Sequence, residues 1–255
     1  MNAAPVLTRY RETTTRGIRL MAHESVASAI TAVLADGNTL HSWAARMPHA
    51  MALQGRATAW RVTLTSGEDV VVRHSAHGGM LAGLTGDVFL SPTRAPSELA
   101  VSLRLRAAGV PTPDVLAYAI YPVFGPLVRA DVVTRTLPGR DLPDAWRAAT
   151  DAAQRSAIVQ AVAELLCRLR HAGAVHPDLN LKNVFIMPTS GGVEAAVLDV
   201  DRVLFGEAQS ATAAYRNLIR LVRSARKWRQ RDGLDFDDPE VLMPLTATAG
   251  PERAL

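Results

Sequence analysis

Three short polar side chains follow apolar segments in the second half of the chain. Asp178 and Asn183 lie in a polar loop that leads into one apolar segment, and Asp199 ends a second apolar segment about sixteen residues farther on. Phosphoryl transfer uses a carboxylate beside the attacking hydroxyl, while an amide and a second carboxylate can hold Mg²⁺ on a nucleotide. Each residue alone is also typical of a polar group that caps a turn. The ordered set predicts a site, with Asp178 as catalytic base or orienting group and Asn183 and Asp199 as metal ligands.

The composition narrows the classes of protein to consider. The 255 residues are enough for one large domain or two lobes. Lys and Arg number 28 against 24 Asp and Glu, and the resulting net charge of +4 is too small to indicate nucleic-acid binding by itself. The single Cys167 excludes an internal disulfide and favours a reducing, cytoplasmic compartment. Neither a signal-peptide pattern nor an apolar run of about 18 residues occurs, so we expect a soluble or peripheral protein.

Apolar periodicity divides the chain into a strand-rich part followed by a helix-rich part. Residues 1–50 are the hardest to interpret, although a helix is expected at 24–35. The expected strands are 57–64, 70–72, 115–120 and 127–134, and a helix is expected at 97–107. The clearest helix is 151–171, because Ile158, Val162, Leu165 and Leu169 recur about one turn apart. The loop with Asp178, a hairpin and a helix at 210–231 follow. This order of elements predicts two lobes with a cleft between them.

The polar loop resembles a known catalytic segment. His176-Pro177-Asp178 through Asn183 is similar to the catalytic loop of protein-kinase-like phosphotransferases, and Asp199-Val200-Asp201 resembles their metal-binding segment. Asp178-Leu179-Asn180 and Leu198 to Arg202 resemble, more narrowly, the lipopolysaccharide core kinases, and among them the kinases of 3-deoxy-D-manno-octulosonic acid (Kdo). Further similar segments are 73–74, 78–79, 109–113, 130–135 and 217–227. The resemblance runs from about Gly55 to Lys227.

The resemblance implies a protein-kinase-like α+β fold of two lobes. Residues 1–138 would form the N-terminal lobe, with 1–50 as a poorly readable extension and 51–138 as a small antiparallel sheet with one main helix that covers the nucleotide. Residues 139–255 would form a mostly helical C-terminal lobe that carries the catalytic loop, the metal-binding segment and a basic helix. The active site is expected in the cleft, and His176 is expected to hydrogen-bond the backbone around the metal-binding segment.

The resemblance also implies an activity. The chain is expected to use ATP and Mg²⁺ and to transfer the γ-phosphoryl group to a sugar hydroxyl, with Kdo of the lipopolysaccharide inner core or a lipid A precursor as acceptor. It would act at the cytoplasmic face of the inner membrane, on an anionic sugar-lipid and without a nucleic-acid partner. Two alternatives stay open: a kinase of the same fold that acts on a protein Ser/Thr or a small molecule, and a nucleotide-binding pseudokinase or scaffold.

The nucleotide contacts follow from the same resemblance. Gly55 and Arg56 lie where a glycine-bearing loop would cover the phosphates, although a loop with one glycine is equally typical of a plain hairpin turn. Arg73 stands where such kinases carry a phosphate-binding Lys that pairs with a helical Glu, here Glu98. Protein kinases carry a Lys at the position of Asn180, so the positive charge is expected from Lys182 or Arg56, although Lys182 is equally typical of a solvated side chain.

A basic stripe follows the catalytic segments. Arg216, Arg220, Arg223 and Lys227 recur at i, i+4, i+7 and i+11, which places them on one face of the expected helix. A stripe of one sign attracts anionic headgroups and phosphorylated lipids. A solvated helix face is the alternative. We expect this face to bind the acceptor or the membrane surface.

Overall fold

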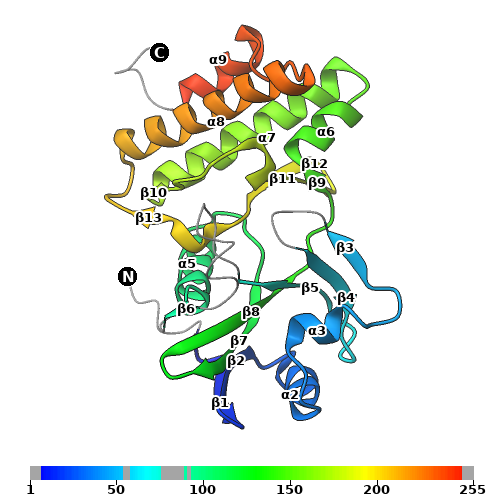
Figure 1. Cartoon of the computed structure of the whole chain (residues 1–255). Coiled ribbons are helices and arrows are strands. Elements are labelled where there is room, and N and C mark those ends of the chain that lie inside the picture. Colours follow the sequence, from blue (N-terminus) through cyan, green and yellow to red (C-terminus); the bar gives the residue numbers. More distant parts are fainter. Residues whose placement is uncertain (1–6, 54–57, 76–88, 91–92, 249–255) are drawn as a thin grey trace. The chain divides into compact units, whose positions relative to one another are not determined.

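The computed structural model describes residues 7–53, 58–75, 89–90 and 93–248, and it divides the chain into two compact units (Figure 1). The first unit takes its residues from Met1–Leu103 and Asp114–Thr136, and the second from Arg104–Pro113 and Leu137–Leu255. None of the described helices is long and apolar enough to cross a membrane.

The first unit is built on an eight-stranded sheet whose neighbouring strands are antiparallel (Figure 1). The strands run in the order β1-β2-β7-β8-β5-β4-β3, and β6 also pairs with β8. Their bounds are Tyr10–Thr15 for β1, Ile18–His23 for β2, Met51–Leu53 for β3, Ala59–Thr63 for β4, Asp69–His74 for β5, Phe89–Leu90 for β6, Val115–Phe124 for β7 and Leu127–Arg135 for β8.

Two apolar clusters cover the two faces of this sheet. On one face Val70 and Val72 pack with Ile30 of helix α2 (Ala27–Ala35) and with helix α3 (Leu40–Ala44). On the other face Val132 and Ile120 pack with Leu99 of helix α5 (Ala95–Ala107). The alternation of side chains along each strand explains why neighbouring residues serve different clusters.

Helix α3 is fixed to the sheet by a buried polar network. Asp131 of β8 is fully buried and accepts hydrogen bonds from the His41 backbone N–H (2.9 Å) and from the Tyr121 hydroxyl (3.0 Å). Its other oxygen lies 2.5 Å from Nδ1 of His74. Tyr121 in turn accepts from the Leu40 N–H at 2.9 Å, and burial raises the pKa of its hydroxyl. Two N–H groups at the start of α3 are therefore satisfied by side chains of β7 and β8.

Helices dominate the second unit. They are α6 (Leu142–Ala148), α7 (Ala152–His171), α8 (Ala211–Asp232) and α9 (Pro239–Ala247). Helix α7 lies against α8, α9 and the strand β12 (Figure 1). Its buried residues include the predicted stripe of Ile158, Val162, Leu165 and Leu169. Asp151 caps its N-terminus by accepting from the Gln154 N–H at 2.8 Å.

Short strands flank the segments that carry Asp178, Asn183 and Asp199. The hairpin of β11 (Val184–Thr189) and β12 (Gly192–Val197) pairs with β9 (Arg140–Asp141), while β10 (Ala174–Val175) pairs with β13 (Leu204–Phe205). The single-turn helices η1 (Leu181–Asn183) and η2 (Val200–Arg202) stand directly before β11 and shortly after β12.

The N-terminal part of the chain belongs to the sheet. Sequence periodicity indicated only a helix at 24–35 there, which the structure has as α2, and gave no assignment for residues 10–23. These residues form the β1–β2 hairpin, and β2 pairs with β7. The sheet is consequently wider than the strands at 57–134 imply.

Candidate active site

Both ring nitrogens of His176 make hydrogen bonds that hold the loop from His176 to Asn183. His176 is buried, its Nε2 lies 2.9 Å from the Leu198 carbonyl oxygen, and its Nδ1 accepts from the Asp178 N–H at 3.2 Å. One tautomer, with the proton on Nε2, satisfies both contacts. The expected bonding of His176 to the backbone beside the metal-binding segment is confirmed. The ring thereby connects the backbone of Asp178 to the residue before Asp199.

Asn180 organises the turn between Asp178 and Asn183. Its side-chain oxygen accepts from the backbone N–H groups of Lys182 (2.9 Å) and Asn183 (3.2 Å), which makes it the N-cap of η1. Its amide nitrogen donates to the Asp178 carbonyl at 3.1 Å. The side chain thus caps a turn where protein kinases carry a charged Lys.

The side chain of Asn183 is oriented by the same loop. Its Nδ2 donates to the Asp178 carbonyl oxygen at 2.8 Å, and its backbone oxygen accepts from the Leu198 N–H at 2.8 Å. The amide nitrogen donates to the loop, and the amide oxygen accepts no hydrogen bond from the described residues, so this oxygen can bind a ligand. That is the end a divalent cation requires.

Asp199 lies in a backbone conformation that is uncommon for residues other than glycine. Its φ and ψ are 56° and 53°, and its side chain is exposed. Asp is among the few residue types that adopt this left-handed region readily. The preceding Leu198 is held at both its N–H and its carbonyl, by Asn183 and His176. Asp178 and Asn183 therefore share one set of hydrogen bonds with Leu198, the residue that directly precedes Asp199.

This donor set fits a magnesium ion carried by a nucleotide. Among the described residues no three His, Cys, Asp or Glu side chains gather as a metal site. Mg²⁺ in nucleotide sites uses one or two protein ligands and fills its remaining positions with phosphate and water. An exposed carboxylate and an oriented amide oxygen, from Asp199 and Asn183, satisfy that requirement.

Lys182 makes a structural ion pair. Its Nζ lies 2.7 Å from Oδ2 of Asp141, the residue that also caps α6 by accepting from the Asp144 N–H at 3.0 Å. The ammonium group lies 5.8 Å from the ring centroid of Trp228 in α8. Lys182 thus ties the catalytic loop to the start of α6 and to α8.

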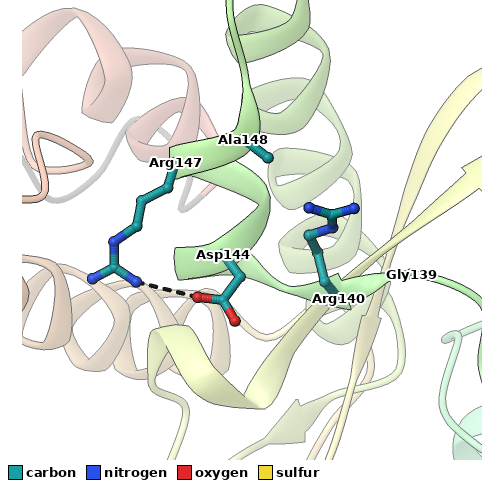
Figure 2. A pocket seen from close by; sticks show the side chains of 5 residues that line it. All are labelled: Gly139, Arg140, Asp144, Arg147 and Ala148. Carbon is teal, nitrogen blue, oxygen red and sulfur yellow. Dashed lines mark hydrogen bonds and ion pairs between the residues drawn. The ribbon is translucent and has the colours of Figure 1, made fainter.

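An open surface pocket lies at the start of α6 (Figure 2). Its lining residues are Gly139, Arg140, Asp144, Arg147 and Ala148, and Arg147 pairs with Asp144 at 3.2 Å. Gly139 has a φ of +131°, and a Cβ there would lie 2.1 Å from the Ile186 carbonyl oxygen, so only glycine fits. Sequence reasoning did not single out these residues as a site.

The first unit carries the remaining nucleotide-binding candidates. Arg73 at the end of β5 forms an ion pair with Glu98 of α5, whose side chain is only 6% exposed. This is the pairing that the resemblance implies for the phosphate-binding position, with Arg in place of Lys. A guanidinium group has five donors, so a second ligand can share it. Gly55 and Arg56 lie outside the described residues, as do Gly78 and Gly79.

Helix α8 supports the catalytic loop with one side and presents cations on the adjacent one. Asn217 is fully buried, accepts from the His176 N–H at 2.9 Å and donates to the Ala174 carbonyl at 2.8 Å. Ser224, two turns on, accepts from the Leu181 N–H at 3.1 Å. These supports were missed from the sequence. The polar Asn217 within an otherwise apolar stripe was the signal available.

The predicted basic stripe is present on α8. All four of its side chains are exposed, and none has a hydrogen bond or ion pair within the described part of the chain: Arg216, Arg220, Arg223 and Lys227. By contrast, Arg229 pairs with Asp237 and Asp238, and Arg231 pairs with Asp232. The stripe therefore remains available to an anionic ligand.

Comparisons with known proteins agree on one family. A model described as the lipopolysaccharide kinase (Kdo/WaaP) family matches residues 41–238. The chain is 28% identical over 194 residues to the 3-deoxy-D-manno-octulosonic acid kinase of Actinobacillus succinogenes, covering 72% of this chain and 78% of that protein. It is 33% identical over 182 residues to the enzyme of the same name from Stenotrophomonas maltophilia, covering 69% and 68%.

A solved structure shows the same fold. WaaP in complex with acyl carrier protein aligns with a TM-score of 0.56 at 18% identity, over 94% of this chain and 88% of that one. At this identity the likeness concerns the fold. The α+β, protein-kinase-like fold predicted from the sequence is confirmed.

Proposed function

Since the chain belongs to the lipopolysaccharide kinase (Kdo/WaaP) family, we propose that it transfers the γ-phosphoryl group of ATP to a hydroxyl of Kdo in a lipid A precursor. Membership of this family confirms the resemblance read from the sequence, and it makes the chain a phosphotransferase that uses an alcohol group as acceptor. ATP use follows from the kinase family.

The observation that carries the site assignment is the hydrogen-bonded assembly around His176. It holds the backbone of Asp178, Asn183 and Leu198, the residue before Asp199, through a few hydrogen bonds within one unit. Asp178 would orient the acceptor hydroxyl and accept its proton, while Asn183 and Asp199 would hold Mg²⁺. When bound, the ion would neutralise charge on the phosphates. The protein contributes positioning, which needs rigid supports of this kind.

The nucleotide contacts we propose are Arg73 and Glu98, with Gly55, Arg56 and Lys182. The Arg73–Glu98 ion pair supports the first two, because a buried carboxylate fixes the guanidinium near the end of β5. The assignment of Gly55 and Arg56 as nucleotide contacts rests on the sequence resemblance. For Lys182, a phosphate would compete with Asp141 for the ammonium group.

The residues that we propose to bind the acceptor substrate lie on α8. Asn217 and Ser224 bond the catalytic loop, and Arg220 lies between them in sequence, one turn from each. The exposed stripe of Arg216, Arg220, Arg223 and Lys227 would hold the anionic groups of a sugar-lipid or of a membrane surface. The site of action would then be the cytoplasmic face of the inner membrane.

The decisive experiment is mass spectrometry of a Kdo-lipid A precursor incubated with the protein and Mg-ATP. The proposal expects a product heavier by one phosphoryl group. Asp178→Ala should abolish this product while Mg-ATP still raises the melting temperature, because a ligand of the folded state stabilises it. Full activity in Asp178→Ala would overturn the role of Asp178. Labelled ATP offered with protein and small-molecule acceptors instead would identify another acceptor if Kdo-lipid A stays unmodified.

A further inference from the structure

The turn between β7 and β8 is an apolar tip, in which residues 122–126 are exposed while Leu127 and Val128 are half-buried and pair with β6. Its seven residues are Pro122, Val123, Phe124, Gly125, Pro126, Leu127 and Val128, so no charged or hydrogen-bonding side chain occurs in it. Phe124 is 81% exposed and Val123 is 44% exposed. Among the large apolar side chains of the described residues, Phe124 is the most exposed. Phe124 belongs to neither of the two apolar clusters of the sheet.

This tip projects past the neighbouring turn of the sheet. A Cβ on Gly17, in the β1–β2 turn, would lie 3.3 Å from the Pro122 ring, so that turn ends beside Pro122. The β7–β8 pairing continues beyond this level as far as Phe124 opposite Leu127. Residues 123–126 therefore extend farther than the adjacent hairpin, and the apolar side chains at their end lack cover from it.

Cations surround the base of the tip. Arg16 stands in the β1–β2 turn and donates to the Ala35 carbonyl oxygen at 3.3 Å, Arg19 of β2 pairs with Ile120 of β7, and Arg129 of β8 pairs with Tyr121 of β7. All three are exposed. The segments 16–19 and 122–129 contain no Asp or Glu, so every charge within them is positive. An uncharged tip with a cationic base is complementary to a surface that is apolar inside and anionic outside.

We propose that the β7–β8 tip inserts into the interfacial layer of an anionic phospholipid bilayer, with Phe124 and Val123 in the acyl boundary and the three arginines at the headgroups. Aromatic side chains favour this layer, and basic residues beside it are attracted to anionic lipid. The tip is a membrane contact of the first unit, separate from the stripe on α8. It goes beyond the proposed function, because lipid insertion does not depend on which hydroxyl is phosphorylated.

Sedimentation of the full chain with vesicles tests whether the tip contributes to lipid binding. With vesicles of phosphatidylglycerol and phosphatidylcholine, Phe124→Ser should bind about tenfold more weakly than the unaltered protein, because burial of one aromatic side chain is lost. Met243→Ser in α9 is the matched control, since Met243 is 70% exposed and lies in the other unit. It should bind as the unaltered protein does. Equal melting temperatures would show that neither variant unfolds.

Two further measurements separate insertion from other contacts. A tryptophan introduced by Phe124→Trp should be quenched by brominated lipid acyl chains, and Arg19→Gln should weaken binding to anionic vesicles about fivefold at low salt. Unchanged vesicle binding by Phe124→Ser, or a loss of self-association in that variant without a change in lipid binding, would overturn the proposal. Phosphorylation of a water-soluble Kdo acceptor should be the same in Phe124→Ser, so failure of the tip and failure of the kinase assignment are distinguishable.

Discussion

At the scale of single residues, Asn180 is an uncharged residue at a position where protein kinases carry a Lys. Its contacts are those of a cap, since its oxygen accepts from the N–H groups of Lys182 and Asn183 and its nitrogen donates to the Asp178 carbonyl. The amide therefore shapes the turn that positions Asp178 and Asn183. The positive charge that the Lys supplies in protein kinases must come from another group.

Asn180→Lys is expected to lower kcat about five- to thirtyfold and to leave KM for ATP nearly unchanged. The variant removes the cap, which costs about 1–2 kcal/mol of local stability. The loop then positions Asp178 less well in the transition state, and kcat falls. Steady-state kinetics with Mg-ATP measure both constants. Asn180→Ser, which keeps a short capping oxygen, is the matched control and should retain most of the activity. A Lys variant as active as the unaltered protein would contradict the capping role.

The spacing of Asp178, Asn183 and Asp199 was enough to nominate them from sequence, because short polar residues beside apolar segments leave a recognisable pattern. Their supports were not predictable in the same way. Asp141 lies 41 residues from its partner Lys182, and Asn217 lies 41 residues from His176. Such pairs come together only through tertiary packing, which no local pattern records.

At the scale of elements, helix α8 supports the catalytic loop through side chains that face it. Asn217→Leu should lower the free energy of unfolding by about 2–4 kcal/mol, because the N–H of His176 and the carbonyl of Ala174 would be left buried without partners. Urea unfolding measures the change. Gln230→Leu, at an exposed position of the same helix, should change it by less than about 0.5 kcal/mol. Equal stability of the two variants would contradict the supporting role of Asn217.

The helices and strands differ in how clearly the sequence predicts them. The expected helices at 151–171 and 210–231 agree with α7 and α8 to within a residue or so, because long amphipathic helices repeat their apolar positions several times. The strand β1 was missed because its residues, Tyr10–Thr15, are mostly exposed and show no apolar alternation. Helix α3 has only five residues and depends on Asp131 and Tyr121 for its N-terminal hydrogen bonds. Apolar periodicity does not predict short elements whose hydrogen bonds come from side chains distant in the sequence.

The segment after α8 carries an acid-sensitive contact. Asp235 accepts from Nε1 of Trp146 at 2.5 Å and from Arg155 at 2.9 Å, and the hydrogen bond from Trp146, followed by Arg155, holds the pKa of this carboxyl below its usual value. A depressed pKa stabilises the fold above the unfolded-state pKa of about 3.9, and this contribution is lost as the pH falls through the folded value. Since the side chain is 40% exposed, the contribution should be at most about 1 kcal/mol.

Asp235→Asn tests this contact through its pH dependence. The variant should be slightly less stable than the unaltered protein at neutral pH, and the difference in melting temperature should disappear as the pH falls below about 4. Thermal unfolding followed across that range measures it. Asp144→Asn, which alters an exposed ion pair on α6, should show a smaller dependence. A difference that grows toward acid pH would have the wrong sign and would contradict the depressed pKa.

At the scale of the whole molecule, the small net charge of +4 conceals an uneven distribution. Several arginines in the second unit are neutralised by nearby carboxylates, as Arg229 is by Asp237 and Asp238. The stripe of Arg216, Arg220, Arg223 and Lys227 has no such partners within the described residues. Uncompensated cations beside a catalytic loop concentrate anionic substrates near it, and this effect weakens with ionic strength.

The double substitution Arg220→Gln and Arg223→Gln should therefore raise KM for a lipid-linked Kdo acceptor about ten- to thirtyfold at low salt, because each basic residue near a charged surface contributes about 1 kcal/mol. The KM for ATP should stay the same. Initial rates at increasing salt measure the effect, and the unaltered protein should approach the variant as screening increases. Arg226→Gln, an exposed position on another face of α8, is the matched control and should behave like the unaltered protein. If Arg226→Gln raised KM as much as the double variant, general positive charge and not the stripe would bind the acceptor.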